Sequence, residues 1–264
     1  MIRHDLFRAL GNKNFVLACV FGFIALAHGL ADYEPGISAR VAHLPPFYIN
    51  AYDAFVWAHN GIIGIIAPLI VTLPFADSLA LDRSSGYLRF ILLRTSRRNY
   101  LLSKMFACAL AGGLSITLPF VVMYGYTSLT LPRGLPSPEQ SRIVSDARSL
   151  GPFGALYREA PDVYIWSLLG LIFIFGMIYA IFGLSLSALT ENRYVILSTP
   201  FLMCNILHFI LSVLGLPQWS PGVAFVPHWI DNVGWIHIIS SLSLVLLASL
   251  VLIGRMFRSL RSHA

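Results

Sequence analysis

Six long apolar runs, separated by short polar segments, constrain this chain more than any other feature of its sequence. Only 11% of the 264 residues are charged, against about 25% in an average soluble domain. A helix of about 20 apolar residues crosses the hydrocarbon core of a bilayer and satisfies its own backbone hydrogen bonds. We therefore expect an all-α polytopic membrane protein. Its six predicted transmembrane helices cover residues 15–31, 61–81, 105–129, 164–189, 195–216 and 236–256.

The polar segments between these runs are too short to form a separate soluble domain. The longest covers residues 131–162, whereas domains begin at about 50 residues. The chain is therefore expected to form a single transmembrane domain over residues 1–264. The segment 131–162 is rich in proline and carries mixed charges, so we expect an external loop with one short helix near residues 138–149. Its role stays open.

The N-terminal segment, residues 1–14, is short and amphipathic. Ile2, Leu6 and Leu10 repeat at helical spacing, with Arg3 and Arg8 elsewhere on the helical wheel. This pattern predicts an interfacial helix lying on the membrane surface, and the alternative is an ordinary basic tail. A basic start before an apolar run is also typical of a signal peptide. Because further apolar runs follow, we interpret the first run as a span.

Two connections are unusually aromatic. Residues 31–60 are predicted to form a loop, and the aromatic residues of its second half indicate an interfacial segment or the lining of a substrate entry. Residues 217–235 contain three prolines and three tryptophans without a continuous apolar run. That composition favours short re-entrant helices between the fifth and sixth spans.

A basic stretch, Asp82 to Lys104, lies between the second and third apolar runs. It contains six Lys and Arg residues and one acid, with apolar and aromatic residues interleaved between the charges. Such a mixture is typical of a helix at the membrane surface, with its apolar side toward lipid or protein. The segment is too short to be a catalytic domain.

The distribution of basic residues predicts the orientation of the chain. Six spans place both termini on one side of the membrane, and thirteen of the eighteen Lys and Arg residues fall on that side. Cytoplasmic segments carry the excess of Lys and Arg, so both termini are expected in the cytoplasm and the chain in the cell membrane. The thirteen are Arg3, Arg8, Lys13, the six of the basic stretch, Arg193, Arg255, Arg258 and Arg261.

The order of residues in the basic stretch resembles a known family. Asp82, Gly86 and Leu88 are followed by an apolar run, then by Ser96-Arg97, and seven residues later by Lys104. The type-2 permeases of ABC exporters carry this order between their second and third spans. Two features depart from the pattern: Arg94 stands where many members have proline, and the segment 131–162 is longer than usual.

The resemblance implies a function and a set of partners. The chain would be the permease subunit of an ATP-driven exporter, forming half of the translocation path beside a second permease copy or a related permease. ATP and Mg²⁺ would be bound by a separate ABC ATPase, which would contact a cytoplasmic coupling helix. The residues expected at that ATPase-coupling interface are Asp82, Arg83, Gly86, Leu88, Arg89, Arg94, Ser96, Arg97 and Arg98.

Several kinds of chemistry are missing from the sequence. There is no phosphate-binding loop, no zinc-binding H-E-x-x-H and no nucleophile elbow. Three cysteines, Cys19, Cys108 and Cys204, lie in apolar runs at a spacing that fits no metal site. We therefore expect no catalytic residues, metal or cofactor in this chain. Although the net charge is +6, the basic residues cluster beside spans, which favours membrane lipid as a partner over nucleic acid.

Two polar residues in apolar runs form a possible intramembrane polar site. Asp77 lies near the cytoplasmic end of the second run, where it is expected to reach the headgroups or pair with Arg83. His208 lies within the fifth run and is expected to hydrogen-bond a neighbouring helix. Two alternatives stay open: an intramembrane enzyme that acts on lipid or peptide through Asp77 and His208, and an ion-coupled transporter. The substrate, and the choice between homodimer and heterodimer, are not indicated.

Overall fold

The computed structural model describes residues 1–41, 50–134 and 147–262. Within these ranges the chain is helical and contains no strand. The predicted helix near residues 138–149 falls largely outside the described residues. In chain order the helices are α1 (Ile2–Leu10), α2 (Lys13–Val41), α3 (Ala51–His59), α4 (Ile63–Thr72), α5 (Ser78–Ser84), α6 (Tyr87–Leu92), α7 (Arg97–Thr130), η2 (Ala147–Phe153), α8 (Gly154–Glu159), α9 (Pro161–Leu186), α10 (Arg193–Val213), η3 (Pro217–Trp219) and α11 (Trp235–Ser262).

Five helices of the described chain are long and apolar enough to cross a membrane: α2, α7, α9, α10 and α11. The predicted second span is not a continuous helix. Helices α3 and α4 meet at an angle of 69° and count as one broken span or a re-entrant pair. Helix α4 has 10 residues, so at 1.5 Å per residue it reaches about 15 Å, half of the hydrocarbon core. A turn that contains Pro74 then separates α4 from α5.

The prediction of a loop is wrong for the described residues of the range 31–60. Helix α2 continues to Val41, and α3 is a helix in which most residues are buried. The ring of Phe55 is buried and packs edge-on against Phe120 and Tyr124 of α7. Small residues let α3 approach α2, since a Cβ atom on Gly29 would lie 2.5 Å from the Ala58 carbonyl oxygen. A short helix that is apolar on most sides is stable when it is buried.

Helices α7 and α9 form the centre of the bundle. A Cβ atom on Gly112 would lie 2.3 Å from Cβ of Ala180, and one on Gly176 would lie 2.9 Å from the Gly112 carbonyl oxygen. The small residues therefore let the backbones of α7 and α9 come into close contact. Gly170 of α9, in contrast, has no neighbour within 4 Å of such a Cβ atom.

The connection between α10 and α11 is buried but not helical beyond η3, so the predicted re-entrant helices are not confirmed. Residues Val223, Ala224 and Phe225 are buried, and the backbone carbonyl of Pro221 accepts a hydrogen bond from Tyr179 Oη of α9 at 3.0 Å. Irregular backbone at membrane depth is tolerated where protein surrounds it and satisfies its polar groups. This packing explains how the segment is accommodated without regular structure.

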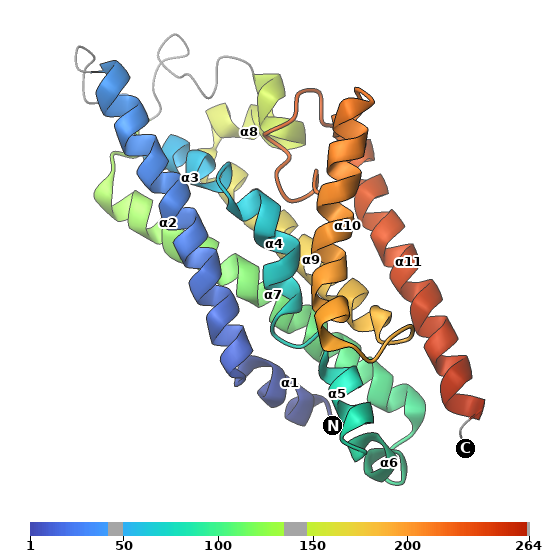
Figure 1. Cartoon of the computed structure of the whole chain (residues 1–264). Helices are drawn as coiled ribbons and strands as arrows, with labels where there is room; N and C mark the ends of the chain where they lie inside the picture. Colours follow the sequence, from blue (N-terminus) through green and yellow to red (C-terminus); the bar gives the residue numbers. More distant parts are fainter. Residues whose placement is uncertain (42–49, 135–146, 263–264) are drawn as a thin grey trace.

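The two ends of the bundle differ in what they contain (Figure 1). Helices α5 and α6 lie at one end together with α1 and both chain termini, while α3, α8 and the α10–α11 connection lie toward the other end. The termini therefore lie at the same end of the bundle, which agrees with an even number of passages through a membrane.

Candidate functional site

The predicted coupling helix is two helices, not one. The resemblance implies one coupling helix in the basic stretch 82–104, but α5 ends at Ser84 and α6 begins at Tyr87. The break occurs at Gly86, which has a φ of 73°. Residues with a side chain rarely adopt this left-handed conformation, so glycine is needed here for the turn. A Cβ atom on Gly86 would meet nothing within 4 Å, so there is room for a side chain. The positive φ, and not a lack of space, is therefore the reason that glycine is needed here.

Helix α6 has an inner and an outer face. Leu88 and Ile91 are half-buried and pack against the core. Phe90 is 69% exposed, and Leu93, in the turn after α6, is 84% exposed. The arginines on this surface are mostly solvated, because Arg89, Arg94 and Arg98 are exposed and Arg97 is half-buried. This end of the molecule thus presents apolar side chains surrounded by positive charge.

Ser96 starts helix α7. Its backbone is extended, and its Oγ accepts a hydrogen bond from the backbone N–H of Asn99 at 3.3 Å. This is the geometry of a helix N-cap, for which serine is a preferred residue. The Ser96-Arg97 pair of the sequence pattern therefore marks the point where the basic stretch becomes a transmembrane helix.

Asp82 points into the protein rather than toward the surface. It belongs to a buried group that we call the polar cluster, made of Asp5 and Arg8 of α1, Asp82 of α5, and Tyr100, Ser103 and Lys104 of α7. Lys104 Nζ lies 2.8 Å from Asp82 Oδ2 and 3.7 Å from Asp5 Oδ1. Arg8 Nη2 lies 3.0 Å from Asp82 Oδ1, and Tyr100 Oη donates to Asp82 Oδ2 at 2.8 Å.

The charges of the polar cluster balance one another. Two carboxylates face two cations, and Ser103 Oγ donates a hydrogen bond to Asp5. Burial by itself would raise the pKa of Asp82, but Lys104, Arg8 and Tyr100 hold that pKa below its ordinary value. Asp82 therefore stays ionised at neutral pH. The Lys104 side chain, which is 0% exposed, has carboxylate partners in two other helices.

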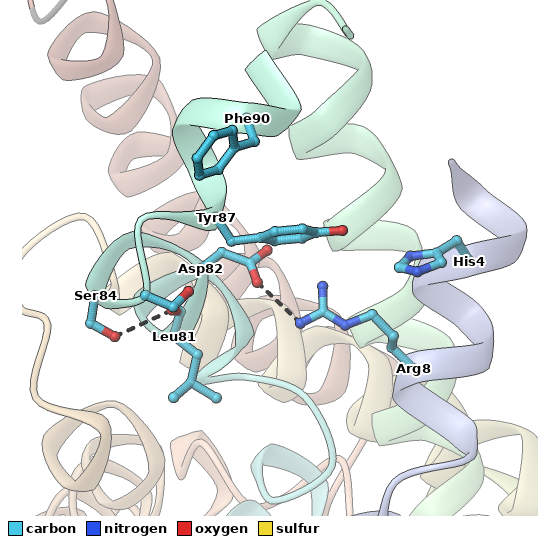
Figure 2. Close-up of a pocket in the computed structure, with 8 residues that line it drawn as sticks. His4, Arg8, Leu81, Asp82, Ser84, Tyr87 and Phe90 are labelled. Atoms are coloured by element: carbon cyan, nitrogen blue, oxygen red, sulfur yellow. Dashed lines mark hydrogen bonds and ion pairs between the residues drawn. The ribbon is translucent and has the colours of Figure 1, made fainter. Parts of the chain in front are cut away.

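A groove of about 690 Å³ opens between α1 and the α5–α6 segment. Figure 2 shows Arg8 reaching across it from α1 to Asp82, with the ring of Tyr87 beside the guanidinium. The groove ends at Phe90, one of the exposed residues of α6. It is lined by His4, Arg8, Leu81, Asp82, Ser84, Ser85, Tyr87 and Phe90.

Arg83 and Asp77 do not pair with each other. Arg83 Nη1 donates to the backbone carbonyl of Ser187 at 2.6 Å, just past the end of α9, where a helix terminus attracts a cation. Asp77 Oδ2 lies 3.1 Å from Arg193 Nη2 at the start of α10.

The two residues of the possible intramembrane polar site are far apart. His208 Nδ1 lies 2.9 Å from Ser220 Oγ, in the connection that follows its own helix rather than in a neighbouring helix. Asp77 contacts Arg193, fifteen residues earlier in α10, which corresponds to about 22 Å along the helix. No structural feature joins the two residues into one site. Among the described residues no group of three or more His, Cys, Asp or Glu side chains is arranged to hold a metal ion.

Two histidines that the sequence pattern did not single out, His59 and His228, form a buried pair. The rings of His59 and His228 are 4.8 Å apart, and His59 also packs edge-on against Phe120 and Phe225. Neither imidazole has a hydrogen-bond partner of good geometry among the described residues. Burial lowers the pKa of His228 to about 4, and the nearby Val56 carbonyl offsets this only in part. Both rings therefore serve as packing groups inside the bundle.

The sequence pattern did not predict that Asp5, Arg8, Tyr100 and Ser103 would join Asp82 and Lys104 in the polar cluster. Asp5 and Arg8 are spaced three apart in α1, and Tyr100 and Lys104 four apart in α7, so each pair shares a helix face. The signal was present in Asp5, the one acid in an otherwise basic N-terminal helix. Nothing in the sequence indicated which distant helix these faces would meet.

Comparison with known families identifies the chain. The model of the ABC-2 family transporter protein matches residues 40–260, which include the α5–α6 segment and every candidate span except the first. Comparison with curated proteins and with solved structures gave no match. The family match confirms the resemblance found in residues 82–104 and extends it over most of the sequence. The chain belongs to the ABC-2 family of transporter proteins, and it is a multi-pass permease of an ABC transporter.

Proposed function

We propose that this permease is the transmembrane subunit of an ATP-driven exporter and couples to a separate ABC ATPase through the α5–α6 segment. The observation that carries the proposal is the outer surface of α6. Phe90 and Leu93 are exposed at the end of the bundle that holds both termini, and exposed arginines surround them. Apolar side chains at a tip rimmed by charge are typical of a protein-binding surface.

Within this proposal the predicted interface residues have different roles. Phe90 and Leu93 supply apolar contact area, while Arg89, Arg94 and Arg98 face acidic groups of the ATPase. Each exposed ion pair contributes only about 0–1 kcal/mol, so apolar packing should dominate the affinity. Of the other predicted residues, Asp82 and Arg83 hold α5 in place, Gly86 makes the turn, Leu88 packs inward and Ser96 caps α7. Arg97 is half-buried at the start of α7.

The proposal requires further subunits. One chain provides half of a translocation path, so a second copy or a related permease completes it. Helix α10 is the least buried span, and its exposed residues Phe209, Val213 and Leu214 are available to that partner or to lipid. ATP and Mg²⁺ bind in the ATPase, and this chain performs no catalysis. The 13-to-5 division of basic residues and the shared end of the termini support a cytoplasmic location for both ends in the cell membrane.

No observation favours the intramembrane enzyme or the ion-coupled transporter. The residues that those alternatives would use have separate partners: Asp77 pairs with Arg193 at the start of α10, whereas His208, about 22 Å further along that helix, contacts Ser220.

Co-purification tests the proposal without knowledge of the substrate. An affinity-tagged permease expressed with its natural ATPase should recover that ATPase in detergent. Phe90→Asp should reduce recovery about tenfold, since it places a charge in an apolar contact. Leu129→Asp is the matched control, because Leu129 is also strongly exposed, at 86% against 69% for Phe90, but lies at the far end of α7. Equal recovery with Phe90→Asp and wild type would contradict docking on α6.

A further inference from the structure

We propose that Lys104 is a positioning residue that locks helix α1 to the coupling end of the permease, so that α1, α5 and the start of α7 move as one body. This inference rests on the proposed function for its role in transport. The contacts that carry it do not depend on that function. They join three helices that are far apart in the sequence, and the joint lies directly behind the surface proposed to meet the ATPase.

Lys104 occupies the centre of the joint. Its ammonium group lies between Asp5 of α1 and Asp82 of α5, and it also sits 4.6 Å from the centre of the Phe75 ring. The side chain has no exposure to solvent. If either carboxylate moved away, the buried ammonium group of Lys104 would lose part of its compensating charge, which is unfavourable. Asp5 and Asp82 are therefore expected to stay beside Lys104 together.

A second contact fastens the same elements at their edge. Asn12, in the turn between α1 and α2, donates through Nδ2 to the Pro74 carbonyl at 3.3 Å, in the turn between α4 and α5. Arg8 adds an ion pair from α1 to Asp82 on the open side of the groove. Helix α1 is therefore held to α5 at two places, while only Gly11 and Asn12 connect it to α2.

The joint gives the ATPase a path to the membrane spans. Helix α7 runs 34 residues from Arg97, or about 51 Å, so a tilt at Lys104 is carried to the opposite end of the bundle. Close packing of Gly112 against α9 prevents α7 from moving alone. A displacement applied to α6 would thus reach α1, α7 and α9 together.

Distance measurements between spin labels test the lock directly. Labels are placed at Arg3→Cys in α1 and Ser84→Cys in α5, both exposed positions, in a chain whose three native cysteines are replaced. The permease alone in lipid nanodiscs should give one narrow distance distribution. Lys104→Met should broaden it by about twofold or more, since Asp5 and Asp82 are left buried without their shared cation. Lys13→Met is the matched control, because Lys13 is the other lysine of the chain and is exposed.

A milder variant keeps the test decisive if Lys104→Met fails to fold. Arg8 is one-third exposed, so Arg8→Gln should fold and should still broaden the distance distribution. Arg3→Gln is the control and should leave the distribution unchanged. For this control the label in α1 is moved from position 3 to the exposed position His4→Cys. An unchanged distribution in folded Lys104→Met, or in Arg8→Gln when Lys104→Met does not fold, would overturn the proposal.

The experiment separates this inference from the proposed function. The distance between α1 and α5 is measured first without any ATPase, so a Lys104-dependent distribution supports the lock even if no ATPase co-purifies. In the complex, ATP with vanadate should leave the wild-type distribution unchanged, because both labels move with one body. A shift between α1 and α5 on ATP binding in the wild-type complex would contradict joint movement even if the ATPase docks as proposed.

Discussion

At the residue scale, the cytoplasmic end of this permease is organised by buried charges that find their partners in distant helices. Lys104 and Asp82 belong to the sequence pattern between the second and third spans, but their partners Asp5 and Arg8 come from the N-terminal helix. The pattern could therefore identify Asp82 but not the direction in which it points. A carboxylate in a basic surface stretch resembles a solvated interface residue until the helix packed against it is known.

Two carboxylates near this end should respond differently to neutralisation. Asp77 pairs with Arg193, whose side chain is 46% exposed and can be hydrated when the partner is lost. We expect Asp77→Asn to change the free energy of unfolding by less than about 1 kcal/mol. Asp82→Asn leaves Lys104 without its nearest partner and should cost about 3–5 kcal/mol. Thermal or denaturant unfolding of the purified variants measures both values, and comparable losses would refute the distinction.

The buried histidine pair predicts a dependence of stability on pH. Burial holds the pKa of His228 at about 4, whereas an unfolded histidine titrates near about 6.5. Between these values the unfolded chain binds a proton that the folded chain does not, so stability falls as pH decreases. The loss should approach about 1.4 kcal/mol per pH unit below about 6.5 and end near pH 4.

Melting temperatures at pH 7.5 and pH 5.5 check this expectation. His228→Gln should reduce the decrease in Tm between the two conditions, while His4→Gln, at an exposed position, should preserve it. An identical decrease in wild type and His228→Gln would show that another group is responsible.

At the element scale, the long apolar runs of the sequence predicted the long spans but did not predict the short helix α3. Residues 105–129, 164–189 and 236–256 correspond closely to α7, α9 and α11, because a run of that length has no other stable form in a bilayer. Helix α3 was missed, since alanines and aromatic residues beside prolines are equally typical of a loop. Its helical form depends on burial against α2 and α7, which is tertiary information.

The turn at Gly86 is the element-scale feature that most directly sets the position of α6. Gly86→Ala forces a side chain into a φ of 73°, so we expect the free energy of unfolding to decrease by about 1–2 kcal/mol. Gly86→Asn should lose less, because asparagine tolerates the left-handed region. Gly125→Ala, in the interior of α7 with free space around it, should instead be neutral or stabilising by up to about 1 kcal/mol. Unfolding measurements that rank Gly86→Ala as harmless would contradict the strained turn.

At the scale of the whole molecule, the bundle separates two kinds of packing (Figure 1). The end that holds both termini contains the polar cluster and the exposed surface of α6. The opposite end holds the irregular connection between α10 and α11, which inserts Phe225 and His228 among the helices. The family of the chain and its membrane class followed from the sequence, whereas the union of α1 with α5 and α7 required the fold.

The proposed use of these two ends depends on which of them meets the ATPase. A photo-crosslinking residue at Leu93, beyond α6, compared with one at Leu129, near the far end of α7, distinguishes them, since both side chains are more than four-fifths exposed. In cells that express the permease with its ATPase, light should produce a permease–ATPase adduct from position 93 and none from position 129. An ATPase adduct from position 129, or its absence from position 93 in an assembled complex, would contradict coupling through the α5–α6 segment.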